Sequence, residues 1–489
     1  MREVGPGMFE ITWAASWGST WAVLLVLLDI ATIARAVTRE HRSAASRLAW
    51  VVVIMSLPLV GVIAYFFLGD TSADRRSEKK LKDLRRELPK RPKGNLPQPE
   101  LPLLYRQSFA RAASVNGFQP VAGNHAKITT DSNESIDWLI SDIDAARDHV
   151  HLLFYIWLTD HNGTRVAEAL MRAVARGVTC RVIVDGLGSR GLLADPLWKS
   201  MQEAGVETVV AFAFRFAPLA AFFRRLDIRN HRKIIVIDHD TTFVGSQNCA
   251  DAAFLVKRKF APWVDIMLRV TGPVAWQSQR LFVSDWMVNG GMDISSVLHR
   301  APPLPEGGFP AVVAGTGPNI SVQGVPDMAQ MLLASAQDEV VITTPYYVPS
   351  EALQQQICAT AVRGVRVRLN VPANNDSHIV GFASRSFYRA LLKAGVEIHE
   401  FQPGLLHAKI LTVDGQAALV GSANLDRRSF DLNYENSMML ADPDTVGAIV
   451  AKQKMFLNAS LSVSRKKVEN WSVPRRVLIN GVGMMAPLL

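Results

Sequence analysis

Cysteine is scarce in this chain of 489 residues. Cys180, Cys249 and Cys358 are odd in number and widely spaced, which argues against a disulfide framework and against a cysteine-based zinc site. The sequence also has no glycine-rich nucleotide loop and no cluster of carboxylates that could ligate a metal ion. We therefore expect the protein to work without a cofactor and without a metal.

Two long apolar runs lie near the N-terminus, at residues 13–33 and 48–68. The first run carries one charge, Asp29, close to one end. Each run approaches the roughly 20 residues that a transmembrane helix needs. A cleaved signal peptide fits poorly, because the first run lacks a basic leading region and a clear small-residue cleavage site. The sequence thus predicts a two-helix transmembrane hairpin within residues 1–69.

The segment at residues 70–103 is first strongly charged and then rich in proline. Residues 70–93 hold ten Lys or Arg and five Asp or Glu, and a proline-rich stretch covers 89–102. This composition predicts a stiff, extended linker. Its cations outnumber the four arginines between the apolar runs, so the positive-inside rule places this segment and the chain that follows it in the cytoplasm. The basic cluster either attracts anionic lipid or is a merely solvated linker.

The formal net charge is +9, a value that would also suit a nucleic-acid-binding protein. Several of these cations stand beside the apolar runs, however, and we expect no nucleic-acid partner. The roughly 385 residues that follow the linker are enough for two domains with cores of their own.

The remaining sequence contains internal repeats. Residues 175–178 recur at 362–365, each time before an apolar strand. Apolar strands alternate with stretches of ten or more residues that suit helices, and this order predicts βαβ units and a mainly parallel sheet. We expect an α/β fold of two halves, 104–300 and 301–489, related by a pseudo-twofold axis.

One polar pattern occurs twice with identical spacing. It reads His, any residue, Lys, four residues and Asp, and Gly-Ser-x-Asn follows it. The copies are His231, Lys233, Asp238, Gly245, Ser246 and Asn248, and His407, Lys409, Asp414, Gly421, Ser422 and Asn424. Two copies that match this closely are not a product of chance composition.

Each copy contains an apolar, largely β-branched run that predicts a buried strand. Strand side chains alternate, so the His and Lys of each copy lie on the same side of it. A turn then leads to a second apolar run, and the resulting hairpin brings Ser and Asn towards His and Lys. Two such halves face to face would offer two imidazoles, two ammonium groups and several donors, a set suited to a phosphate.

These residues resemble the two HKD motifs of the phospholipase D superfamily. In that family one His is a covalent nucleophile on phosphorus, the other is the general acid and base, and no metal takes part. The resemblance favours His231 as the nucleophile, while the near-symmetry of the copies leaves the choice open. It implies the catalytic residues His231, Lys233, Asp238, His407, Lys409 and Asp414, and the phosphate-binding residues Ser246, Asn248, Ser422 and Asn424.

The family pattern also places a carboxylate after each Asn to orient an imidazole. Glu435 and Asp265 match this pattern. An acceptor behind an imidazole fixes its tautomer and stabilises the imidazolium. We expect Asp238 and Asp414 to hold the backbone of the motif rather than to touch substrate.

With the N-terminal runs included, the chain resembles the bacterial cardiolipin synthases over nearly its whole length. The likeness is carried by stretches such as Asn230-His231-Arg232-Lys233 and residues 421–429. It implies a multi-pass protein of the bacterial inner membrane that joins two phosphatidylglycerol molecules into cardiolipin and releases glycerol. One departure is the turn His239-Asp240, which replaces the usual glycine-containing turn.

Two other activities fit the same motifs. A phospholipase D-type hydrolase would use water as the acceptor, and a related transferase would use another alcohol such as ethanolamine. From another class, a membrane-anchored nuclease would be supported only by the basic linker.

The first half is longer than the second just before the motif. About fourteen more residues separate Glu207 from His231 than separate Glu397 from His407. The extra stretch, 212–225, is aromatic and basic. It suits an element that dips among lipid headgroups, and it suits a buried helix equally well.

Overall fold

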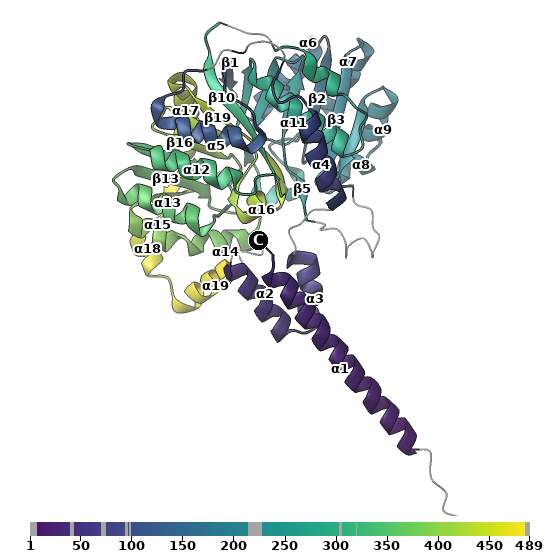
Figure 1. Ribbon diagram of the computed structural model, residues 1–489. Coiled ribbons are helices and arrows are strands. Elements are labelled where there is room, and N and C mark those ends of the chain that lie inside the picture. Colours follow the sequence, from purple (N-terminus) through teal and green to yellow (C-terminus); the bar gives the residue numbers. More distant parts are fainter. Residues whose placement is uncertain are drawn as a thin grey trace, which may run out of the picture. The chain divides into compact units, whose positions relative to one another are not determined.

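The computed structural model describes residues 7–39, 44–69, 75–92, 96, 99–213, 227–302, 306–318 and 320–484 (Figure 1). Its contacts separate an N-terminal unit, residues 1–74, from a main body that comprises residues 75–215 and 227–487. The predicted aromatic insertion at 212–225 lies almost wholly outside the described residues.

The N-terminal unit is helical and is held together by a small apolar cluster. Its elements are α1 (Gly7–Val37), α2 (Ala44–Ser56), α3 (Val60–Ala64) and a π-helical turn, η1 (Tyr65–Gly69). Trp50 and Tyr65 meet edge to face at 5.4 Å, and Ala36, Ile54 and Val62 are buried with them. The helices approach closely at Gly61, where a Cβ would lie 2.6 Å from the carbonyl oxygen of Val53.

Within the described ranges, no helix has both the length and the apolar composition required to cross a bilayer.

Part of the predicted extended linker is instead a helix that packs on the main body. Helix α4 (Arg75–Glu87) lies against α11 (Val274–Val288). The Arg280 guanidinium donates to the carbonyl oxygens of Arg85 at 3.0 Å and Pro89 at 2.5 Å. The helix forms and packs because it has an apolar stripe at helical spacing, although charged residues surround that stripe in the sequence. The stripe consists of Leu81, Leu84 and Leu88, which are buried in the structure.

Sixteen strands of the main body form one sheet. They are β1 (Val121–Ile128), β2 (His149–Phe154), β3 (Thr179–Asp185), β4 (Glu207–Ala211), β5 (Arg229–Asn230), β6 (Ile234–Ile237), β7 (Thr241–Gly245), β9 (Met267–Thr271), β10 (Phe309–Thr316), β11 (Glu339–Thr343), β13 (Arg366–Pro372), β14 (Glu397–Phe401), β16 (Ile410–Val413), β17 (Ala417–Gly421), β19 (Asn433–Ala441) and β20 (Ser460–Ser462).

The strand order repeats itself outward from the antiparallel β1–β10 pair. One side runs β1-β9-β7-β6-β2-β3-β4, and the other runs β10-β19-β17-β16-β11-β13-β14 before it ends in the additional strand β20. Each side thus has the same sequence of equivalent strands, which is the topology of a duplicated half. An apolar cluster continues through both halves, with Leu153 and Ile234 in the first and Ile342 and Ile410 in the second.

The prediction of a mainly parallel sheet is wrong. Only β2-β3-β4 and β11-β13-β14 pair in parallel along the main path of the sheet. The remaining neighbours on that path are antiparallel. The reason is that each motif is a hairpin, and hairpins insert antiparallel pairs into what would otherwise be a run of βαβ units.

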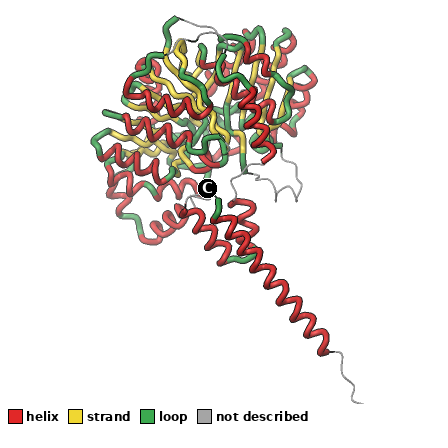
Figure 2. Tube along the Cα trace, viewed as in Figure 1, coloured by secondary structure: helices red, strands yellow, loops and turns green. Residues whose placement is uncertain are grey.

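Helices surround the strands of the main body (Figure 2). Several begin at a side chain that accepts hydrogen bonds from the first turn, as Asp131, Asp160 and Ser350 do. They are α5 (Arg106–Asn116), α6 (Ser132–Ala145), α7 (His161–Ala175), α8 (Arg190–Ala194), α9 (Pro196–Glu203), α12 (Gly324–Ser335), α13 (Glu351–Val362), α14 (His378–Ser386), α15 (Tyr388–Ala394), α16 (Arg427–Asp431), α17 (Pro443–Asn458), α18 (Arg465–Glu469) and α19 (Val473–Met484), with 3-10 turns η2 (Leu103–Tyr105), η3 (Leu255–Phe260) and η4 (Ser295–His299).

Short strands tie each motif to the opposite half. β5, just before the first motif, pairs in parallel with the start of β19. Just before the second motif, β15 (Leu405–Leu406) pairs in parallel with β8 (Trp263–Val264) of the first half. A further short pair, β12 (Tyr347–Val348) with β18 (Leu425–Asp426), lies within the second half. The backbone N–H groups of the two motif histidines continue these contacts, His231 to Tyr434 O at 2.9 Å and His407 to Val264 O at 2.7 Å.

Candidate active site

The two motif hairpins form as the sequence predicts. β6 pairs antiparallel with β7, and β16 with β17. His231 and Lys233 immediately precede β6, and His407 and Lys409 immediately precede β16. All four side chains are buried. The hairpins therefore deliver the polar residues of both copies into the interior of the main body.

Each motif imidazole is bound by a carboxylate from the other half. His231 Nδ1 lies 2.9 and 3.0 Å from the two carboxylate oxygens of Glu435. His407 Nδ1 lies 2.6 Å from Asp265 Oδ1. The predicted carboxylates are thus in place behind the imidazoles, and they are exchanged between the halves. A carboxylate can only accept here, so Nδ1 carries the proton and Nε2 of each ring is left with its lone pair.

Burial sets the protonation of the two imidazoles. It lowers the pKa of His231 to about 4, although the Glu435 carboxylate acts in the opposite direction. The pKa of His407 is also lowered by burial and by Lys409. Burial alone would raise the pKa of Asp265, but the interactions with His407, Lys409 and Ser246 together outweigh burial and bring the pKa to about 2. Near neutral pH the site holds ionised carboxylates behind neutral rings.

The two motif lysines carry unusually labile protons. Lys233 Nζ donates to its own His231 carbonyl at 2.8 Å, and Lys409 Nζ donates to His407 O at 2.6 Å. Burial lowers the pKa of Lys233 to about 7, and that of Lys409 to about 8, against partial compensation by the buried carboxylates. Each ammonium group has further donors that these bonds do not use.

The serines bind the carboxylates, which differs from the prediction that they bind phosphate. Ser246 Oγ donates to Asp265 Oδ1 at 2.6 Å, and Ser422 Oγ donates to Glu435 Oε2. Both hydroxyls are fully buried. They follow the glycine that ends the second strand of each hairpin, and that strand pairs directly with the segment that carries the carboxylate.

The motif asparagines differ from one another. Asn248 Oδ1 accepts a hydrogen bond from the backbone N–H of Ile156 at 3.3 Å. Asn424 Oδ1 is buried and has no hydrogen-bond partner among the described residues. A buried acceptor of this kind favours a polar ligand.

The motif aspartates accept hydrogen bonds from backbone N–H groups at the starts of β2 and β11. Asp238 accepts from the backbone N–H groups of Arg147, Asp148 and His149 at 2.8–3.1 Å. Asp414 makes the equivalent three bonds at the start of β11, at 2.8–2.9 Å. Both residues follow the motif strands, so each is separated from its own His and Lys by the length of the strand.

Two aromatic side chains next to the imidazoles escape the sequence analysis. The Tyr155 ring lies 4.9 Å from that of His231, edge to face, and the Trp263 ring lies 4.7 Å from that of His407. Tyr155 follows β2, and Trp263 precedes Asp265. The one sequence signal that could have identified Tyr155 and Trp263 is their position at the end of a strand that lies next to a motif.

A buried ion pair also supports the first motif. Arg232 donates to both oxygens of Asp285 at 2.6 and 2.8 Å and to the Glu435 carbonyl at 3.1 Å. Its equivalent in the second motif is Ala408, so this support has no counterpart there. Asp285 lies on α11, far from the motif in sequence, and spacing alone gave no reason to select it.

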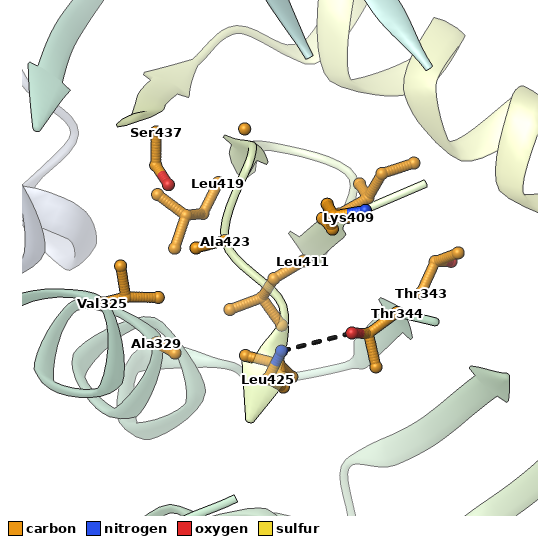
Figure 3. A pocket seen from close by; sticks show the side chains of 12 residues that line it. Val325, Ala329, Thr343, Thr344, Lys409, Leu411, Leu419, Ala423, Leu425 and Ser437 are labelled. Atoms are coloured by element: carbon orange, nitrogen blue, oxygen red, sulfur yellow. Dashed lines mark hydrogen bonds between the residues drawn. The ribbon is translucent and has the colours of Figure 1, made fainter. Parts of the chain in front are cut away.

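A small cavity lies beneath the second motif, with Lys409 on its rim and Val325 and Ala329 of α12 on its wall (Figure 3). The Leu425 backbone N–H donates to Thr344 Oγ1 beside it at 3.2 Å. Its volume is about 30 Å³. That is room for about one or two waters rather than for a phosphodiester.

The turn after the first motif strand holds a group of histidines. His239 has a left-handed φ of 71°, where the equivalent residue of the second half is Gly415, with φ 62°. His239 Nε2 lies 2.9 Å from Asp148 Oδ2, and His149 Nδ1 lies 3.3 Å from it. These three residues have the proximity of metal ligands, but Arg300 also donates to Asp148 Oδ2 at 2.9 Å, so a cation already occupies the carboxylate.

Comparison with known proteins agrees with this geometry. The family described as "Cardiolipin synthase, PLD-like domain" matches residues 139–286 and 330–455. Cardiolipin synthase A of Erwinia tasmaniensis is 34% identical over 478 residues, which cover 94% of this chain and 96% of that protein. The chain belongs to the family of cardiolipin synthases with phospholipase D-like domains.

Further matches cover the N-terminus and the fold. Cardiolipin synthase A of Edwardsiella ictaluri is 35% identical over 458 residues, or 90% of each chain. The "Phospholipase_D-nuclease N-terminal" family matches residues 22–69. The crystal structure of phosphatidylserine synthase from Haemophilus influenzae Rd KW20 aligns with a TM-score of 0.59 over 78% of this chain and 99% of that one. At 16% identity, this last likeness concerns the fold alone.

Proposed function

We propose that the protein is a membrane-bound phosphatidyltransferase that makes cardiolipin and glycerol from two phosphatidylglycerol molecules. The observation that carries the proposal is the pair of buried imidazoles, each backed by a carboxylate of the opposite half, in a chain that matches cardiolipin synthases over nearly all of its length. Two imidazoles divide one difficult displacement on phosphorus into two easier ones.

In the first step His231 is the nucleophile. Its Nε2 lone pair attacks the phosphorus of the first lipid while Glu435 holds Nδ1–H. The bond from phosphorus to the glycerol headgroup breaks, and His407 gives its Nε2 proton to the departing oxygen. The negative phosphodiester beside the rings favours the protonated form of His407 that this transfer needs. Glycerol leaves, and a phosphatidyl-histidine remains.

In the second step the roles of acid and base are exchanged. His407, now neutral, takes the proton from a headgroup hydroxyl of the second phosphatidylglycerol as that oxygen attacks phosphorus. The bond from phosphorus to His231 Nε2 breaks, and cardiolipin forms. His407 ends this step protonated, as it was when the first lipid was bound. A bilayer holds the second lipid at high effective concentration, which favours transfer over hydrolysis.

The other motif residues bind or position. Lys233 and Lys409 offset the charge that develops on the phosphoryl oxygens, and the amide groups of Asn248 and Asn424 bind the same oxygens. We assign Ser246 and Ser422 to the carboxylates on which their hydroxyls lie. Asp238 and Asp414 fix the strand ends. Thus only some of the motif residues touch substrate.

We place the protein in the bacterial inner membrane, with the main body on the cytoplasmic side. The support is the surface of α1, where large apolar residues are exposed on all faces of the helix, since a helix that is apolar all round suits a lipid environment. The exposed residues include Trp21, Val23, Leu24, Leu25, Val26, Leu27, Leu28 and Ile30.

Expression in bacterial cells that make phosphatidylglycerol but no cardiolipin tests the proposal, with lipid mass spectrometry as the readout. We expect cardiolipin to appear with the native chain and not with His407→Ala. Phosphatidic acid in its place would identify a hydrolase, and a new headgroup would identify a transferase with another alcohol. Neither product despite good membrane expression would overturn the proposal.

A further inference from the structure

The first half contains an insertion between its motif and its carboxylate. Residues 249–264 separate Asn248 from Asp265, whereas only residues 425–434 separate Asn424 from Glu435. The first connection is longer by six residues. Turn η3, Leu255–Phe260, has the same length of six. The two halves therefore differ at the place where the chain passes from one catalytic group to the next.

The inserted turn is exposed in an unusual way. Leu255 and Val256 are 65% and 67% exposed, and they stand next to one another. The next three residues, Lys257, Arg258 and Lys259, are cations that are also exposed. No residue of the turn is buried. An apolar pair followed directly by cations suits the boundary between acyl chains and anionic headgroups.

The base of the turn is fixed, although its tip is not covered. Phe254 is buried at a left-handed φ of 36°, and it stacks on Trp263 with ring centroids 3.9 Å apart. Trp263 in turn contacts the ring of His407. On the other side, Lys257 Nζ lies 2.5 Å from Asp376 Oδ2, and Asp376 is buried. The exposed tip thus stands on side chains that reach a motif imidazole.

We propose that the turn Leu255–Lys259 is a membrane-docking element whose partner is the surface of an anionic bilayer. Leu255 and Val256 enter the acyl boundary, and Arg258 and Lys259 meet anionic headgroups. Lys257 remains paired with Asp376. The inference rests on the proposed function, since an enzyme that joins two lipids must receive both at the surface of the bilayer. A nucleic acid would satisfy the cations but would leave the apolar pair in water.

Fluorescence of the full chain tests the docking directly. The Val256→Cys variant, labelled with an environment-sensitive dye, is reconstituted in vesicles of phosphatidylglycerol and phosphatidylcholine. Cys358 is replaced by Ser because it is partly exposed and could take up the dye. Cys180 and Cys249 are buried and are kept. Val362→Cys is the matched control, since Val362 is 73% exposed on α13. We expect a blue shift, and quenching by spin-labelled acyl chains, at position 256 only.

Three results would overturn the proposal. They are an aqueous emission at position 256 in these vesicles, an equal shift at position 362, and a shift caused by single-stranded DNA and not by lipid. Each result is independent of turnover, so the docking can fail while cardiolipin synthesis stands. Conversely, cells that express the protein could make no cardiolipin while the fluorescence still shows docking to vesicles.

Activity provides a second measurement. Leu255→Glu combined with Val256→Glu should lower turnover on phosphatidylglycerol vesicles about tenfold more than turnover on dispersed short-chain lipid, whereas Val362→Glu should leave that ratio unchanged. Arg258→Gln should weaken the gain from anionic lipid by about fivefold. Equal losses on both forms of lipid would show that the turn supports the fold or the chemistry and not the docking.

Discussion

The carboxylate of Glu435 lies 2.9 Å from Nδ1 of His231, although 204 residues separate the two in sequence. The reciprocal contact, from Asp265 to His407, has the same form. Each half therefore supplies the nitrogen of one pair and the oxygen of the other. Neither half contains both members of a motif imidazole–carboxylate pair, so the halves must be assembled before either motif ring is oriented.

Replacing these carboxylates should separate the two steps. Glu435→Gln removes the charge behind His231 and should lower kcat about a thousandfold. Asp265→Asn should lower kcat on phosphatidylglycerol by a similar factor, because His407 is then a poorer proton donor. It should lower kcat far less on a substrate with an activated leaving group, because such a group departs without a proton from His407. Asp414→Asn is the control, since it should lower the melting temperature with little effect on kcat. Equal losses for both variants on both substrates would contradict the assigned roles.

The covalent intermediate should form on His231. A phosphatidylglycerol analogue quenched during turnover should leave an acid-labile phosphoramidate, which mass spectrometry of peptides can locate. His407→Ala should still form the adduct when the leaving group is activated. An adduct on His407 would reverse the two roles while leaving the reaction class intact.

Activity should fall with rising pH at values well below the usual pKa of lysine. Burial lowers the pKa of Lys233 to about 7 and that of Lys409 to about 8. As pH rises through these values the ammonium groups lose their protons, so kcat/KM on dispersed lipid should fall between about pH 7 and 8. Bound phosphodiester favours the charged form, and the limb of kcat should therefore lie higher. A kcat/KM that stays level to pH 9 would refute this expectation.

Acid should destabilise the histidine turn. Burial lowers the pKa of His239 to about 4, so the unfolded chain binds more protons between pH 6.5 and 4, and stability falls as pH falls through that window. His239→Asn tolerates the left-handed φ and does not titrate. We expect it to recover on the order of 2 kcal/mol of the acid loss, measured from melting curves at pH 7 and 5. Parallel losses in both proteins would contradict it.

Removing the N-terminal unit should separate chemistry from lipid access. A chain that begins at Arg75 keeps α4 on α11, whereas one that begins at Leu101 lacks α4 and leaves the Arg280 guanidinium without its carbonyl partners. The longer chain should retain turnover on detergent-dispersed lipid. On vesicles at physiological salt it should lose a factor on the order of a hundred to ten thousand, because tethering has that effect on local concentration. If the truncated chain were as active on vesicles as the full chain, the N-terminal unit would serve to target the protein to the membrane and not to hold the active site near lipid.

Local patterns in the sequence were enough to predict the hairpins, and the family resemblance was enough to select the two carboxylates. The apolar runs after Lys233 and Lys409 specify β6 and β16, and Glu435 stands where an imidazole-orienting acid is expected. The exchange between halves depends on how β5 meets β19 and β15 meets β8. Such pairings join residues that are distant in sequence, and no periodicity within one strand records them.

Other features were hidden by their neighbours. The leucine stripe of α4 lies among charges, so composition suggested an extended linker. Ser246 shares a motif with residues that are predicted to bind phosphate, and only the three-dimensional position of Asp265 shows that its hydroxyl donates to that carboxylate. The Arg232–Asp285 pair joins a motif to α11, and its importance follows from burial that a sequence does not display.

The antiparallel pairing of β1 with β10 joins the two halves in one hydrogen-bonded sheet, with Val121 opposite Ala311. A ladder of this kind resists opening, so we expect the halves to stay together between the two displacements of the proposed mechanism. The two imidazoles would then keep a constant separation through the cycle. The phosphorus atom would move between them, and its configuration would invert once in each displacement.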